Sequence, residues 1–137
     1  MKSSPHSIVL DSTALAEAAA DSPAMYPWLT WARRSDSSIY ISAATLAETT
    51  DGSPRDARIH RIAKAIEVVP VSSEIGFAAG RLRAIGATTR AKPRDLTVDA
   101  LVAATACHVR PPAVVLTSDV KDLERILVGT GVLVRAV

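Results

Sequence analysis

The stretch Ser7-Ile8-Val9-Leu10-Asp11-Ser12-Thr13 carries the first clear structural signal in the chain. Three aliphatic residues run without interruption and end at an aspartate, which two hydroxyl residues and an alanine-rich segment follow. A short continuous apolar run of this kind is typical of a strand buried on both faces, as in a parallel sheet covered by helices. Open α/β sheets bind ligands just beyond the carboxyl ends of such strands. Because a buried acid needs a cation or hydrogen-bond donors, Asp11 is predicted to be the first member of a site.

Outward from this stretch, apolar runs alternate with helical patterns along the whole chain. Further strands are predicted at 39–41, 67–71, 113–116 and 132–134. Pro70 indicates that the second of these is an edge strand or ends there. Helices are predicted over 14–20, 24–34, 42–50, 54–65, 72–84, 95–109 and 120–127, with Gly86 stopping the fifth. The alternation predicts one domain over residues 1–137, a three-layer α/β/α sandwich with a mainly parallel sheet.

The composition excludes several classes of protein. Hydrophobic residues make up 48% of the 137 residues, but no apolar run is long enough to span a bilayer. The apolar part of the N-terminal segment is too short for a signal peptide. Cys107 is the single cysteine, so an internal disulfide is impossible, and we expect it to be a small core residue. These observations predict a cytoplasmic protein with no membrane partner.

Positive charge is concentrated in the middle of the chain. Between Pro54 and Arg94 there are nine lysines or arginines but only three acids. Such an excess is compatible with a polyanionic partner, although solvated helix faces would explain it equally well. The nine basic residues are Arg55, Arg58, Arg61, Lys64, Arg81, Arg83, Arg90, Lys92 and Arg94.

Four acids fall where the alternation of strands and helices would gather them. Asp11 and Asp119 each follow a buried strand, Glu48 lies on the helix after the second strand, and Asp99 lies near the start of the 95–109 helix. Taken singly, each acid could be a helix cap or a solvated side chain. Together, ionised carboxylates share a small space only when cations neutralise them. Oxygen ligands without a histidine or cysteine cluster favour Mg²⁺ or Mn²⁺, and such ions promote phosphodiester hydrolysis.

The acidic segments resemble the four motifs of PIN-domain ribonucleases and, more narrowly, of the VapC-type toxins of bacterial toxin–antitoxin pairs. The segments are Ile-Val-Leu-Asp11-Ser-Thr-Ala-Leu, Ser-Ala-Ala-Thr-Leu-Ala-Glu48-Thr, Val-Asp99-Ala-Leu-Val-Ala-Ala-Thr-Ala and Val-Val-Leu-Thr-Ser-Asp119-Val-Lys-Asp122-Leu. The Ala-Gly80-Arg-Leu-Arg segment between the second and third motifs is similar to that group as well. The third motif is the most specific, and the first alone is weak.

The resemblance implies a PIN domain that acts as an Mg²⁺-dependent endoribonuclease, with Mn²⁺ as a possible substitute, on structured RNA such as tRNA, rRNA or mRNA. It also implies a VapB-type antitoxin partner and a homodimer. The implied metal ligands are Asp11, Glu48, Asp99 and Asp119, with Asp122 as a rival for the fourth position and Asp95, one predicted helical turn before Asp99, also within reach. The implied orienting hydroxyls are those of Ser12, Thr13, Thr117 and Ser118. RNA-binding cations are expected at Arg81, Arg90, Lys92 and Arg94.

Two other functions compete with the nuclease. A haloacid-dehalogenase-like phosphatase would need a second acid two residues after Asp11, where this chain has Thr13. A non-catalytic Mg²⁺-binding interaction module, similar to a response regulator, would need an early pair of acids, but Asp11 is the only acid up to Leu15. The sequence therefore matches the requirements of these two functions less well than those of the nuclease.

Overall fold

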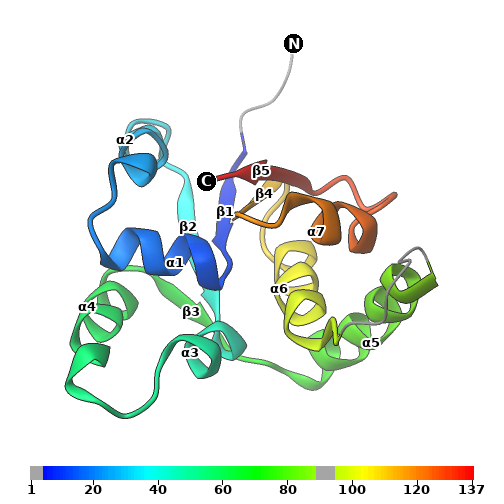
Figure 1. Ribbon diagram of the computed structural model, residues 1–137. Coiled ribbons are helices and arrows are strands. Elements are labelled where there is room, and N and C mark those ends of the chain that lie inside the picture. The colour runs from blue at the N-terminus through cyan, green and yellow to red at the C-terminus, as the bar shows by residue number, and fades with distance from the viewer. Residues whose placement is uncertain (1–4, 89–94) are drawn as a thin grey trace.

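The computed structural model of the protein describes residues 5–88 and 95–137. Five strands form one parallel sheet in the order β3-β2-β1-β4-β5 (Figure 1). As predicted, β3 is an edge strand and ends just before Pro70. The strands are β1 (Ser7–Leu10), β2 (Ser38–Ser42), β3 (Glu67–Val69), β4 (Ala113–Thr117) and β5 (Leu133–Ala136).

The central strand β1 lies between β2 and β4. Leu10 is paired with Ile41 on one side and with Leu116 on the other. The chain therefore builds the sheet outward from β1 to β3, and then returns to build the other half from β4 to β5. The change of direction between β1 and β4 is a topological switch point, where open α/β sheets place their ligands.

Helices cover both faces of the sheet, which confirms the predicted three-layer architecture (Figure 1). One apolar cluster joins β1 and β4 to α1, α2 and α4, and a second joins them to α5, α6 and α7. The helices are α1 (Ser12–Ala19), α2 (Tyr26–Arg34), α3 (Ala43–Thr49), α4 (Ala57–Ala65), α5 (Ser73–Thr88), α6 (Thr97–His108) and α7 (Val120–Ile126), and 3₁₀ turns at Pro23–Met25 and Pro54–Asp56 precede α2 and α4. None of the helices in the described ranges combines the length and hydrophobicity that a bilayer crossing requires.

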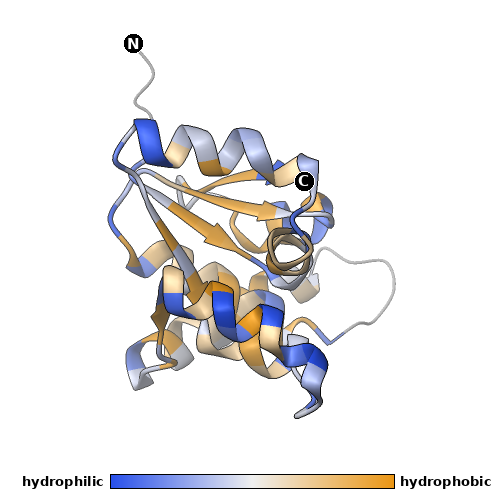
Figure 2. Ribbon diagram, turned by 90° about the vertical axis from the view of Figure 1, so that its left-hand side faces the viewer, coloured by the Kyte–Doolittle hydropathy of each residue, from blue (hydrophilic) through white to orange (hydrophobic). Residues whose placement is uncertain are grey.

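Burial on both faces explains the uninterrupted apolar runs of the two central strands. Ile8 and Leu10 belong to the cluster with α1, whereas Val9, which points to the opposite face, belongs to the cluster with α6. All four residues of β1 and all five of β4 are buried. Figure 2 shows the strands coloured as hydrophobic between helices that carry hydrophilic residues on their outer turns.

The fifth helix does not stop at Gly86, contrary to the prediction. Helix α5 continues to Thr88, and Gly86 lies inside it, buried against the rest of the protein. A Cβ atom at this position would lie 2.7 Å from Cγ1 of Ile126 and 3.2 Å from Cδ1 of Leu96. The glycine therefore permits the close approach of α5 to α7 and does not terminate the helix.

The prediction that Cys107 is a core residue is also wrong. Cys107 lies in the last turn of α6 and is exposed, while Ala103 and Ala106 of the same helix face the core. Partial burial of the sulfur still raises the pKa of the Cys107 thiol above its ordinary value. A raised pKa makes the thiol a poor nucleophile at neutral pH.

Two fully buried helical threonines differ in whether their hydroxyls are satisfied. Oγ1 of Thr105 donates to the carbonyl oxygen of Leu101 at 2.8 Å, whereas Oγ1 of Thr45 has no hydrogen-bond partner among the described residues. A buried hydroxyl without a partner costs about 1–3 kcal/mol. We therefore expect Thr45→Val to raise the free energy of unfolding by about 1 kcal/mol.

Urea unfolding followed by circular dichroism measures this difference, with Thr105→Val as the matched control. The control removes a satisfied hydroxyl from an equally buried helical position and is expected to give no comparable gain. A loss of stability in Thr45→Val would show that its hydroxyl makes a favourable interaction.

Candidate functional site

Asp11 connects the end of β1 to the start of α1. Its Oδ1 accepts hydrogen bonds from the backbone N–H of Ala14 at 2.9 Å and from the hydroxyl of Thr13 at 2.7 Å. This N-cap explains why α1 begins at Ser12, directly after the strand. Among the described residues, none donates a hydrogen bond to the second carboxylate oxygen, Oδ2. Asp11 is thus a buried carboxylate with one oxygen held by the protein and a second available for a ligand.

The hydroxyl of Thr13 joins the ends of β1 and β4. It donates to Asp11 and accepts a hydrogen bond from the backbone N–H of Ser118 at 3.0 Å, across 105 residues of sequence. The hydroxyl of Thr117 accepts a bond from the backbone N–H of Asp119 at 2.9 Å. The turn that carries Asp119 is therefore fixed relative to Asp11. Of the predicted orienting residues, Thr13 and Thr117 use their hydroxyls here, while Ser118 uses its backbone.

The two candidates for the fourth acid lie in different environments. Asp119 is exposed in the turn between β4 and α7, whereas Asp122 is only 5% exposed within α7. Oδ1 of Asp122 lies 3.5 Å from Nη1 of Arg125, one turn further along the helix. Asp122 is therefore buried and paired within its helix, whereas Asp119 is accessible to a ligand. This role of Arg125 was not predicted, although the i, i+3 spacing of an acid and an arginine is a recognisable signal in the sequence.

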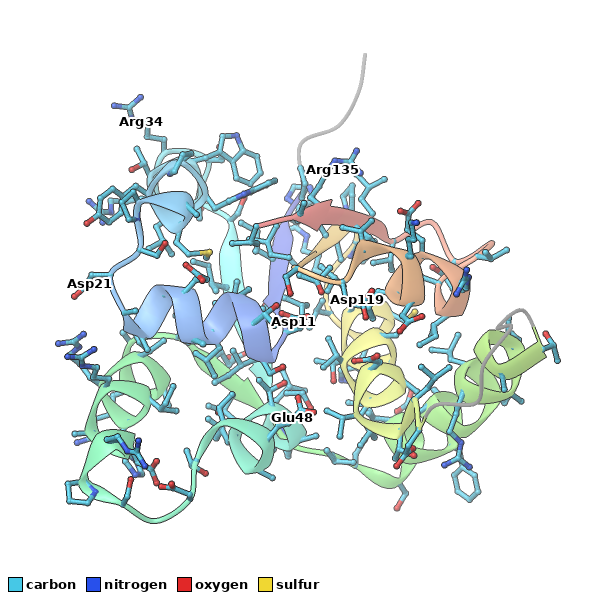
Figure 3. All side chains as sticks on the ribbon, in the orientation of Figure 1. Asp11, Asp21, Arg34, Glu48, Asp119 and Arg135 are labelled. Atoms are coloured by element: carbon cyan, nitrogen blue, oxygen red, sulfur yellow. The ribbon has the colours of Figure 1, made fainter. Side chains whose placement is uncertain are left out.

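Glu48 and Asp99 come from the two helices that border this edge of the sheet. Glu48 is exposed near the end of α3, and Asp99 is half-buried in the first turn of α6. Helix α3 contacts α1 and α6, and α6 contacts β1 and β4. Figure 3 shows Asp11, Glu48 and Asp119 around the same edge of the sheet, between α1 and α6.

The four acids lie on elements that meet at one edge of the sheet, but their side chains do not form a metal-binding cluster among the described residues. In residues 5–88 and 95–137, no three acidic, histidine or cysteine side chains are grouped closely enough to hold a metal ion. The donor set itself, which contains only carboxylate and hydroxyl oxygens, fits a hard cation such as Mg²⁺. The match to a metal thus rests on the kind of donor atoms and on the strand order, and not on a preformed cluster of the described side chains.

Asp95 does not lie on α6, so its predicted place one helical turn before Asp99 is wrong. Helix α6 begins at Thr97, and Oδ1 of Asp95 accepts bonds from the Thr97 backbone N–H at 3.0 Å and from its hydroxyl at 2.6 Å. Nη1 of Arg83 on α5 also donates to the Thr97 hydroxyl, at 3.0 Å. Asp95 thus shapes the entrance to α6, because a short polar side chain here competes with the helix for backbone N–H groups.

The expected RNA-binding cations are only partly described. Arg81 is exposed on α5, whereas Arg90, Lys92 and Arg94 lie outside the described residues.

A separate acidic turn at residues 51–56 follows α3 and was not among the predicted site residues. Asp56 is 8% exposed and accepts hydrogen bonds from the backbone N–H groups of Asp51 and Gly52. Hydrogen bonds from the side chain and backbone of Ser53 lower the pKa of Asp51. The Asp56 carboxylate is thus hydrogen-bonded within the turn and has a structural role there.

Comparisons with known proteins extend this description. Residues 8–126 match the family model of the PIN domain. A search of curated proteins finds no match to the sequence.

Several solved structures share the fold over nearly their whole length. A chain of the VapBC2 complex from Rickettsia felis, bound to a DNA fragment from its promoter, has a TM-score of 0.74 at 18% identity, with 96% of this chain and 98% of that chain covered. DNA-bound VapBC from Salmonella typhimurium gives 0.71 at 19% identity, with 95% and 97% covered. VapBC-1 from nontypeable Haemophilus influenzae gives 0.64 at 17% identity, with 95% and 97% covered. At these identities the likeness concerns the fold.

Proposed function

Because the chain belongs to the PIN domain family, whose members are generally nucleases, we propose that it is a Mg²⁺-dependent endoribonuclease and the toxin of a toxin–antitoxin pair. One observation carries most of the weight. The Asp11–Thr13–Ser118 hydrogen-bond chain fixes two acid-bearing strand ends beside each other at the switch point of the sheet. Carboxylates at one edge of the sheet attract a cation, and a bound cation in turn attracts a phosphate group.

In this proposal Asp11, Glu48, Asp99 and Asp119 hold the metal, and Mn²⁺ can replace Mg²⁺. Asp11 contributes its Oδ2, because Oδ1 is engaged by Ala14 and Thr13. When bound, Mg²⁺ would polarise the phosphodiester and lower the pKa of a water molecule. No nucleophilic side chain is required. Asp122 is assigned to the Arg125 pair and not to the metal.

RNA is the proposed substrate because the middle of the chain is basic. The small number of aromatic residues bears on how the RNA would be recognised. Contacts from arginine and lysine to phosphates do not depend on the identity of the base, and each such contact makes binding more sensitive to salt. With aromatic residues at only 4% of the chain, stacking on many splayed bases is unfavourable. We therefore propose recognition of RNA by its shape and backbone, with Arg81 as one contact.

An antitoxin is the proposed protein partner. Three of the similar solved structures are VapBC complexes, two of them bound to DNA. A VapB-type protein that covers the acidic edge would keep the nuclease inactive, because it would exclude RNA from the carboxylates.

Mapping of RNA ends tests the proposal. Purified protein is incubated with total bacterial RNA in Mg²⁺, in Mn²⁺ and with EDTA, and new 5′ ends are sequenced. We expect discrete cleavage sites that appear with either metal and vanish with EDTA. Absence of metal-dependent cleavage, together with harmless expression of the gene alone, would contradict the proposal.

Thr13 is expected to be a positioning residue in this site. Thr13→Val removes both the bond to Asp11 and the bond to Ser118, so we expect RNA cleavage to fall by about 10–100-fold. Thr13→Ser keeps the hydroxyl and should retain most of the activity. The RNA cleavage rate and the Mn²⁺ affinity are measured for the wild type, Thr13→Val and Thr13→Ser, after thermal unfolding has shown that all three proteins are folded at the assay temperature. If Thr13→Val and Thr13→Ser cleave RNA at the same rate, the hydroxyl has no positioning role.

A further inference from the structure

The first turn of α3 contains a buried hydroxyl group that has no hydrogen-bond partner. Thr45 is fully buried, and its Oγ1 is the only buried side-chain nitrogen or oxygen atom in residues 5–88 and 95–137 without a hydrogen bond. Later on the same helix, the hydroxyls of Thr49 and Thr50 donate to backbone carbonyl oxygens at 2.8 and 2.6 Å. Buried polar groups in folded proteins are almost always hydrogen-bonded, so the exception at Thr45 requires an explanation.

The place of Thr45 in the helix explains why its hydroxyl has no local partner. A threonine inside a helix can donate to the carbonyl oxygen four residues earlier, as Thr105 does to Leu101 at 2.8 Å. Helix α3 begins at Ala43, so the residue four positions before Thr45 is Ile41, which lies in strand β2. The usual acceptor therefore does not belong to the helix. A partner for the Thr45 hydroxyl has to come from outside α3.

Thr45 belongs to a row of oxygen-bearing side chains that runs along the acidic edge. Ser42, Thr45 and Glu48 are spaced three residues apart, so each lies beside the next on the surface of α3. Ser42 and Thr45 are fully buried, whereas Glu48 is exposed. Ser42 ends β2 directly beside the end of β1, which Asp11 follows. The row therefore begins next to Asp11 and leads to Glu48, and Figure 3 shows these two acids at the same edge.

We propose that Thr45 is a positioning residue of the metal site, and that its hydroxyl hydrogen-bonds to a water molecule of the cation's hydration shell. This role rests on the proposed function, because it requires a cation at the acidic edge. Mg²⁺ is bound through one or two carboxylates and keeps several of its water molecules. A hydroxyl both donates and accepts hydrogen bonds, so Thr45 can hold such a water beside Asp11. Protein groups that hold a metal's ligands in place strengthen metal binding.

This role makes opposite predictions for the protein with and without a metal. In EDTA the hydroxyl has no partner, so Thr45→Val should be more stable than the wild type. With a metal bound, the wild-type hydroxyl gains its partner, which valine cannot replace. The stabilisation that a ligand provides increases with its affinity, so Thr45→Val should gain less stability from the metal than the wild type does. A purely structural residue would change the stability equally in both conditions.

Mn²⁺ binding and urea unfolding of the full chain, both measured without RNA, test the proposal. The electron paramagnetic resonance signal of free Mn²⁺ gives the affinity, and unfolding is compared in EDTA and in the same excess of Mn²⁺. We expect Thr45→Val to bind Mn²⁺ about tenfold more weakly than the wild type. Thr45→Ser keeps the hydroxyl and should bind Mn²⁺ as the wild type does. Thr105→Val is the matched control, because it removes an equally buried helical hydroxyl that already has a partner, and it should leave the affinity unchanged.

Equal Mn²⁺ affinities of the wild type and Thr45→Val would overturn the proposal, and so would a wild type that does not bind Mn²⁺. An equal loss of affinity in Thr105→Val would overturn it as well, because the effect would then follow from altered packing. A loss of stability of Thr45→Val in EDTA would show that the hydroxyl already has a partner, which is the opposite of what the proposal requires. Failure of the proposed function has a different signature, since a protein that binds Mn²⁺ but cleaves no RNA would contradict the nuclease and not the role of Thr45.

Discussion

Replacement of Asp11 by asparagine is expected to lower the rate of Mg²⁺-dependent RNA cleavage by about 10³-fold, which corresponds to about 4 kcal/mol. The asparagine oxygen can still accept the bonds that Asp11 receives from Ala14 and Thr13, because asparagine is an equally good N-cap. The fold should therefore remain intact. What the variant loses is the negative charge, and with it the attraction for the cation.

Asp21→Asn is the matched control for this experiment. Asp21 follows the other end of α1, far from the acidic edge in Figure 3, and its ion pair with Arg61, at 3.7 Å, is exposed. Its φ of 54° is a conformation that asparagine adopts readily. The control should cleave RNA at the wild-type rate. Full activity in Asp11→Asn, or equal losses in both variants, would remove Asp11 from the proposed metal ligands.

Gly86→Ala is expected to lower the free energy of unfolding by about 1–2 kcal/mol, even though alanine favours helices. The added methyl group would lie 2.7 Å from a carbon of Ile126 and 3.2 Å from one of Leu96. Ile126 is fully buried and Leu96 is 2% exposed, so neither side chain can move into solvent to make room. The overlap must be relieved by separating α5 from α7.

Gly80→Ala on the same helix provides the comparison. Its new methyl group meets nothing within 4 Å, so the higher helix propensity of alanine should raise the free energy of unfolding by up to about 1 kcal/mol. Urea unfolding curves of both variants measure the opposite signs. A gain in stability for Gly86→Ala would mean that Ile126 repacks without cost.

Most of the fold could be predicted because its signals are local. The apolar runs before Asp11 and Asp119 identify the two strands buried on both faces, and Pro70 identifies the edge strand. The errors arose where a distant contact decides the outcome. Gly86 looks like a helix stop until Ile126, forty positions later, is known to lie against it.

The candidate site could be predicted at the level of strand ends but not of hydrogen bonds. The alternation of strands and helices brings Asp11 and Asp119 to neighbouring strands, and the structure places them there. That Asp122 is buried beside Arg125 depends on which side of α7 faces the core, and two acids three residues apart do not reveal it. The bond between Thr13 and Ser118 depends on side-chain rotamers that no pattern encodes.

The position of β1 between β2 and β4 has a consequence for the protein during its synthesis. A chain that has been translated only as far as α6 contains β1, β2 and β3, but β1 still lacks β4, its neighbour on the other side. The partner of Thr13 is Ser118, near the end of the chain, so Asp11 is not tied to its counterpart until almost all residues have been translated. A nascent or truncated chain therefore has an incomplete acidic edge. The acids that follow β1 and β4 can therefore lie side by side only after β4 and its turn have been translated.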